Sequence, residues 1–134
     1  MSVDPNLVEA PYPLEKVLGY RLTDWSEGYA VVELPLRSDH ANRQGLPHGG
    51  VHATLMDTAM GYCGCYTGDS ERKRMALTLS LTINYLSRPT GQLLRAFATQ
   101  TGGGRSTYFA SAELRDETNI LVATSTGVFR YRNG

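Results

Sequence analysis

Cysteine is scarce in this sequence of 134 residues, which contains only Cys63 and Cys65. Two positions apart on a helix, the two side chains point to different sides and cannot easily form a bridge. The N-terminus also lacks the charged start and apolar core of a signal peptide. A disulfide-stabilised secreted domain is therefore a poor fit, and we expect a cytoplasmic protein with reduced thiols.

A charge excess of either sign is missing as well, because 13 basic and 13 acidic side chains cancel. Nothing in this balance favours a nucleic acid or an anionic membrane as a partner. No apolar run reaches the length of a membrane-spanning helix, since His52 and Asp57 interrupt the best candidate. We therefore expect neither nucleic-acid binding nor membrane binding.

What the sequence does contain is typical of a globular protein, with 41% hydrophobic and 19% charged residues. The length is enough for one domain with a substantial core. No linker, repeat or low-complexity segment divides the chain. We expect a single domain over residues 1–134, in which residues 1–18 form a short helix or turn.

Local patterns predict one long helix and six strands. The helix covers residues 49–67, and its apolar side chains occupy most of its circumference, which is typical of a buried helix. A curved antiparallel sheet that wraps the helix would bury it and produce an α+β layer fold. The strands are expected at residues 19–24, 29–36, 77–85, 92–101, 106–114 and 120–131.

Residues 77–85 give the clearest strand signal. Leucine, isoleucine and tyrosine at the odd positions alternate without a break with threonine, serine and asparagine at the even positions. This strict period of two places Thr78 on the polar face of the expected strand.

Groups with chemical potential gather at the start of the helix. A bare helix N-terminus offers unpaired N–H groups and partial positive charge, and Gly49 and Gly50 leave room for a ligand there. Such an N–H group can hold a carbonyl oxygen as it becomes an oxyanion. Eight positions after Gly49, one carboxylate, Asp57, interrupts the apolar helix. It fits either a base or nucleophile, or a buried acid satisfied by a hydroxyl group.

The distance between these two groups bears on assembly. Eight residues at 1.5 Å rise separate Gly49 and Asp57 by about 12 Å along the helix axis. Within one chain they cannot meet at the same substrate atom. If they share a site, Asp57 must come from a second subunit with an antiparallel helix, and a two-fold dimer then holds two equal sites.

This sparse set of groups suits a thioester. Asp57 could deprotonate a water molecule or attack the carbonyl carbon itself. A thiol has a pKa of about 8.5 and leaves as a thiolate without strong acid help. The sequence offers no obvious second acid for an amine or alkoxide leaving group, so we expect hydrolysis of an acyl group from a thiol.

Two other patterns are weaker. His48 and His52 have the spacing of a metal pair, but the acid of an HExxH motif is missing, and we expect no metal. Residues 72–74, which read Arg-Lys-Arg, are expected to be an exposed cluster of loop charges.

The segment 42–61 reads N-x5-HGG-x4-LMD-x2-MG. It resembles the active-site segment of hotdog-fold acyl-CoA thioesterases, and more narrowly their PaaI-type branch, which includes the phenylacetate-pathway thioesterase. The order of elements is also similar over residues 14–132, which is essentially the whole chain. The resemblance implies a hotdog fold, in which an antiparallel sheet of about six strands wraps one long helix.

The resemblance also implies residue roles. Gly49 would supply the oxyanion N–H group, and His48 beside it would shape the turn or bond the thioester. Asn42 would orient the water molecule or the acyl carbonyl. Asp57 would be the base or nucleophile and would act across the dimer. Thr78 falls where the family places a serine or threonine that positions the water.

For substrate and assembly, the resemblance implies a small aromatic or medium-chain acyl-CoA, no cofactor, and homodimers with shared active sites that commonly pair into tetramers. Two alternatives stay open: a non-catalytic acyl-CoA-binding protein and an enoyl-CoA hydratase of the same fold. The candidate substrate-binding residues are Gly50, Arg88, Arg105 and Ser106.

Overall fold

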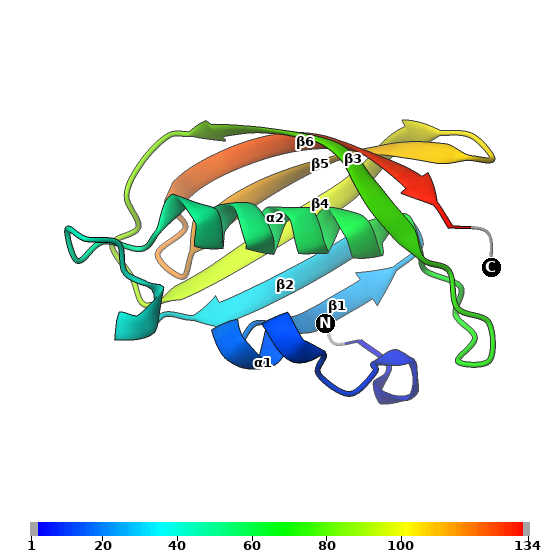
Figure 1. Ribbon diagram of the computed structural model, residues 1–134, viewed down its shortest axis with the longest axis horizontal. Helices are drawn as coiled ribbons and strands as arrows, with labels where there is room; N and C mark the ends of the chain where they lie inside the picture. Colours follow the sequence, from blue (N-terminus) through cyan, green and yellow to red (C-terminus); the bar gives the residue numbers. More distant parts are fainter. Residues whose placement is uncertain (1–2, 133–134) are drawn as a thin grey trace.

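The computed structural model describes residues 3–132 and places one long helix against one sheet (Figure 1). Six strands form the sheet in the order β1-β2-β4-β5-β6-β3, and neighbouring strands run antiparallel. The sheet curves around helix α2, so the hotdog arrangement expected from the sequence is confirmed. The elements are α1 Pro13–Leu18, β1 Arg21–Ser26, β2 Tyr29–Pro35, α2 Gly49–Cys63, β3 Ala76–Tyr85, β4 Leu93–Gly103, β5 Thr107–Asp116 and β6 Leu121–Tyr131.

The core lies between α2 and the face of the sheet that it covers. Leu55, Met56 and Met60 of α2 are fully buried, and burial of one such side chain contributes about 1.5–3 kcal/mol. The two strands that contact α2 most, β2 and β4, contribute three buried alanines to this face, and these small side chains let the helix lie close to the sheet. The buried side chains of β2 and β4 in this cluster are Ala30, Val32, Leu34, Leu94, Ala96 and Ala98.

Helix α2 ends at Cys63, four residues before the predicted end, so the predicted boundary was wrong. The next residue, Gly64, lies against the ring of Tyr108, where an added Cβ would overlap a ring carbon. The Tyr108 hydroxyl donates to the Met60 carbonyl (2.9 Å), and the Tyr131 hydroxyl donates to the Gly64 carbonyl (2.7 Å). Two tyrosines from the sheet thus satisfy carbonyls that a helix end leaves unpaired.

Strand β3 does not keep the strict alternation that its sequence predicts. Thr78 is paired with Phe129, whereas the next paired residue is Ser80, so Leu79 is an extra residue in a β-bulge. Such a bulge re-aims the side chains on one side of it. Because Phe129 belongs to the buried core, Thr78 faces α2 and not the polar outer face.

One buried carboxylate organises the turns at the end of the sheet where β5 leads into β6. Asp116 accepts hydrogen bonds from the N–H groups of Thr90 (2.8 Å), Gly91 (2.9 Å), Thr118 (2.9 Å) and Ile120 (3.1 Å). Burial alone would raise the pKa of Asp116, but the hydrogen bonds outweigh it and hold the pKa well below its usual value. The sequence marked these residues only as turns.

The chain before β1 forms a 3-10 turn, Pro5–Leu7, followed by α1. Helix α1 has Pro13 at its first position and stops at Gly19, whose φ of 86° is left-handed. Figure 1 shows α1 beside β1, whereas the 3-10 turn lies toward the end of the molecule where β3 begins. Within residues 3–132, no helix is long and apolar enough to cross a membrane.

Candidate active site

Asp57 lies near the middle of α2 and has one close partner. The hydroxyl of Thr78 on β3 donates to Asp57 Oδ1 over 2.7 Å. The β-bulge at Leu79 makes this contact possible, because it turns Thr78 toward the helix. The hydrogen bond fixes the orientation of a carboxylate that is only half-buried, so the carboxylate can still meet a ligand.

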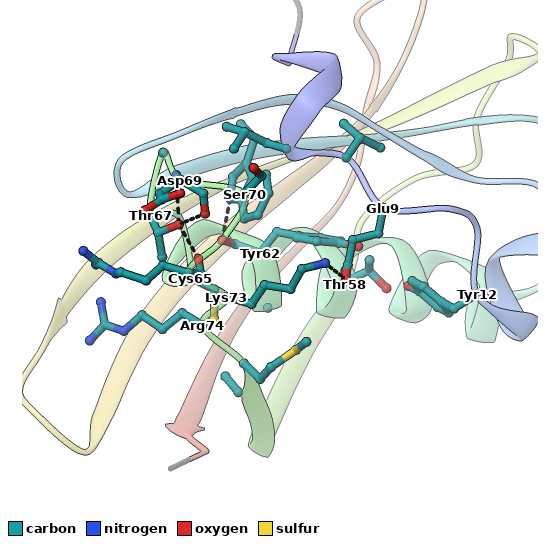
Figure 2. Close-up of a pocket in the computed structure, with 18 of the residues that line it drawn as sticks. Glu9, Tyr12, Thr58, Tyr62, Cys65, Thr67, Asp69, Ser70, Lys73 and Arg74 are labelled. Atoms are coloured by element: carbon teal, nitrogen blue, oxygen red, sulfur yellow. Dashed lines mark hydrogen bonds and ion pairs between the residues drawn. The ribbon is translucent and has the colours of Figure 1, made fainter. Parts of the chain in front are cut away.

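Asp57 lines a large cavity of about 810 Å³. The C-terminal half of α2, the N-terminal segment, the start of β3 and the loop before β3 form its walls (Figure 2). Asp57 and Thr78 both line the cavity, which brings two of the predicted site residues together. The other predicted residues do not belong to its lining.

The start of α2 forms a second, separate group. The ring of His48 accepts a hydrogen bond at Nδ1 from the Gly50 N–H (2.7 Å), which caps the helix. The same geometry assigns the ring proton to Nε2. The Gly50 N–H is therefore already engaged. The Gly49 N–H has no acceptor among the residues that the structure describes, so it is the donor left for a ligand.

Neighbouring side chains leave little room for a Cβ atom at either glycine. A Cβ at Gly50 would lie 2.9 Å from His48 Nδ1, and a Cβ at Gly49 would lie 3.3 Å from the ring of Tyr85. Tyr85 ends β3, and its hydroxyl donates to the Gly49 carbonyl over 2.7 Å. Sequence reasoning missed Tyr85, because the alternation of β3 identified it only as an inward-facing strand residue.

Asn42 shapes the loop that leads to this helix start. Its side-chain oxygen accepts from the N–H groups of Gln44 (2.9 Å) and Leu46 (3.1 Å). The His48 N–H then donates to the His40 carbonyl (2.8 Å), which closes the loop against buried His40. Asn42 thus positions the backbone that carries His48 and Gly49.

The remaining predicted binding residues lie at opposite ends of the sheet. Arg88 follows β3 at the end near the start of α2, where Tyr85 meets Gly49. Arg105 and Ser106 lie in the turn between β4 and β5, and the Ser106 carbonyl accepts from the Tyr131 N–H at the far end. A single chain therefore does not bring Arg88 together with Arg105.

Comparison with known proteins now adds to this geometry. Residues 44–123, more than half of the chain, match the model of the thioesterase superfamily. The chain belongs to the thioesterase superfamily. It is thus a thioester hydrolase, and the PaaI-type resemblance seen in the sequence is confirmed by the structural relatives below.

Among curated relatives, a predicted esterase of Pseudomonas aeruginosa is 31% identical over 99 residues, which cover 74% of this chain and 72% of the relative. A predicted esterase of Archaeoglobus fulgidus is 29% identical over 115 residues, covering 85% and 71% of the two chains. Both names agree with hydrolysis of an ester-like bond.

Among solved structures, a conserved protein of Pseudomonas aeruginosa superposes with a TM-score of 0.81 at 28% identity, over 95% of this chain and 97% of that one. The PaaI protein from the phenylacetic acid degradation operon of E. coli superposes with a TM-score of 0.78 at 26% identity, over 90% and 85%. The similarity covers the whole fold and not only the segment around Asp57.

The thioesterase also has an aromatic wall that sequence reasoning missed. Tyr12, Trp25 and Tyr62 line the cavity beside Asp57. Trp25 donates from Nε1 to the Tyr62 carbonyl (2.8 Å), and the Tyr12 and Tyr20 hydroxyls are 2.6 Å apart. These contacts join segments far apart in the sequence, so no local pattern could predict them.

Two hydroxyl groups of this wall remain protonated at neutral pH. Burial is the main cause that raises the pKa of Tyr62 to about 12, and the negative charge of Glu15 adds to it. Burial and the hydrogen bond to Tyr20 raise the pKa of Tyr12 further. The wall is therefore uncharged and suits an acyl group without charge close to Asp57.

Proposed function

We propose that this thioesterase hydrolyses acyl-CoA with a small aromatic or medium-chain acyl group, at sites that two chains share. The observation that carries the proposal is the separation of the two halves of the site. Asp57 and Thr78 line the cavity, while the free Gly49 N–H lies at the start of the helix, about 12 Å from Asp57 by helix rise. A second chain is needed to bring the halves together.

The exposed edge of the sheet supports a partner chain at this place. Strand β3 is an edge strand, yet Leu77 and Leu79 are each 57% exposed and Tyr85 is 54% exposed. Apolar edges are a liability that natural proteins cover. A second copy that pairs along β3 would cover this edge and set the two α2 helices antiparallel. Two such dimers then associate into a tetramer.

In the proposed reaction, the Gly49 N–H of one subunit holds the thioester oxygen. Asp57 of the partner subunit removes a proton from water, and the water oxygen attacks the carbonyl carbon. The tetrahedral oxyanion collapses, the C–S bond breaks, and the thiolate takes up a proton. Attack by Asp57 itself, followed by hydrolysis of the anhydride, needs the same residue in the same place.

The other predicted residues act around this centre. Thr78 holds the carboxylate and positions the water, while His48 and Asn42 fix the loop that presents Gly49. Gly50 contributes its small size, because its N–H is engaged by His48. Arg88, Arg105 and Ser106 stay candidates for binding coenzyme A. The two buried free cysteines suit the reducing cytoplasm, where we propose that the enzyme works.

An acyl-CoA panel assayed with a thiol-trapping reagent tests the proposal. We expect release of coenzyme A, fastest with aromatic or medium-chain acyl groups. Saturable binding with no thiol release would replace hydrolysis with a binding role. Loss of the enoyl absorbance without thiol release would identify a hydratase.

The Thr78→Val variant should lower kcat about tenfold. Valine has almost the same shape as threonine but lacks the hydroxyl group that donates to Asp57. The Thr78→Ser variant keeps the hydroxyl and should retain most of the activity. Steady-state kinetics on both variants measure kcat, and circular dichroism checks that both are folded. Equal activity of the valine and serine variants would show that the hydrogen bond has no catalytic role.

A further inference from the structure

The basic run of residues 72–74 lines the active-site cavity and is more than a loose cluster of surface charges. The loop that carries it has internal hydrogen bonds. The Thr67 hydroxyl donates to the Arg72 carbonyl (2.7 Å), and the Arg72 N–H donates to the Asp69 carbonyl (3.0 Å). These bonds place Arg72, Lys73 and Arg74 at the edge of the cavity that holds Asp57.

The three cations differ in what they contact. Lys73 forms an ion pair with Glu9 of the N-terminal segment, and Figure 2 shows its side chain reaching across the cavity toward Glu9. The Arg74 guanidinium lies 3.9 Å from the centre of the Tyr131 ring, and Figure 2 shows it pointing away from Lys73. Among the described residues, Lys73 is the one cation of the three that is neutralised by an ion pair.

The arginines keep their charge available. Within residues 3–132, neither Arg72 nor Arg74 has a carboxylate partner. Asp69, an acid of the same loop that also lines the cavity, accepts the Glu71 N–H at Oδ1 (3.0 Å). Its carboxylate is therefore oriented by the loop backbone. Arg72 and Arg74 together form what we call the cationic rim of the cavity.

We propose that the cationic rim binds the anionic part of the thioester substrate, namely the phosphate groups of its thiol carrier. This rests on the proposed function. The aromatic wall near Asp57 suits the uncharged acyl group. Arg72 and Arg74 are exposed, so the rim lies where a charged carrier would extend into solvent. Guanidinium groups pair with phosphate oxygens through two parallel hydrogen bonds, and the Tyr131 ring holds Arg74 in place.

The test compares two thioesters of the same acyl group, one on coenzyme A and one on pantetheine, which lacks the nucleotide phosphates. The Arg72→Gln and Arg72→Gln/Arg74→Gln variants should raise KM for acyl-CoA about tenfold or more and leave kcat/KM for acyl-pantetheine unchanged. The wild-type advantage of acyl-CoA should shrink with added salt. Arg21→Gln, an exposed arginine outside the cavity lining, is the matched control.

Two outcomes would overturn the proposal as it stands. An equal loss on both thioesters would overturn the proposal, because the rim would then act on folding or on the acyl group. A loss confined to pantetheine thioesters that carry a terminal carboxylate on the acyl group would keep the anion site but change its source. Arg72→Gln alone covers the case in which loss of the Arg74–Tyr131 contact disturbs folding.

A binding measurement separates this proposal from the proposed function. Titration calorimetry with coenzyme A itself needs no turnover, and the double variant should bind about tenfold more weakly than wild type. Unchanged affinity for coenzyme A would overturn the proposal that the cationic rim binds its phosphate groups. If the wild type hydrolyses no thioester but the variant still loses affinity, the proposed function fails while the rim stands.

Discussion

The Asp57→Asn variant is expected to lower kcat about a thousandfold while the protein still folds and assembles. A positioned base contributes about 10²- to 10⁴-fold, and an amide can neither take a proton from water nor attack the carbonyl carbon. The amide oxygen can still accept the Thr78 hydroxyl, so the local packing stays in place. Thiol-release kinetics with the best acyl-CoA of the panel measure the effect.

Two controls make this result specific to the carboxylate. Asp57→Ala should lose as much activity as the asparagine variant, and both should show the circular dichroism spectrum and the assembly state of the wild type. Undiminished turnover of every acyl-CoA that the wild type cleaves would remove Asp57 from the mechanism.

The Gly49→Pro variant is expected to lower kcat about 10²- to 10³-fold, the typical effect of losing one oxyanion donor. Proline has no N–H group and is favoured at the first position of a helix. His48 before it is already extended, with φ −69° and ψ 136°, as the residue before a proline must be. The substitution therefore removes the donor and fits the backbone of the helix start, while its added carbon atoms crowd the ring of Tyr85.

Gly49→Ala is the matched control for this change. It adds a Cβ in the same tight position against Tyr85 and keeps the N–H group. The alanine variant should be far more active than the proline variant. Equal activity of the two would mean that crowding at Tyr85, and not the N–H group, explains the loss.

The fold followed well from the sequence, because its signals are local. The apolar circumference of α2 and the period of two in the strands predicted each element to within a few residues. The end of α2 was missed because a distant side chain, Tyr108, closes it at Gly64. Contacts of this kind leave no periodic trace in the sequence.

The candidate site was predictable in its residues and not in its geometry. Asp57 and Gly49 were visible as an acid in an apolar helix and a glycine at its start. The bulge at Leu79, which brings Thr78 to Asp57, breaks an alternation that the sequence displays without interruption. Hydrogen bonding between strands decides such a bulge, so the sequence pattern alone favoured the wrong face for Thr78.

The lining of the cavity was beyond local reasoning for a similar reason. Tyr12, Trp25 and Arg74 are far apart in the sequence and meet only when the N-terminal segment and the loop before β3 fold over α2. Arg74 looked like part of a solvated charge cluster, because the five residues before it are all polar or charged.

The most direct test of the shared site is a mixture of the Asp57→Asn and Gly49→Pro chains, refolded together in equal amounts. In a mixed dimer with shared sites, one site carries both changes and the other carries neither. Random pairing makes half of the dimers mixed, so about a quarter of the wild-type activity should return. Activity no higher than the average of the two separate variants would mean that Gly49 and Asp57 of different subunits do not act in one site, and would contradict the account.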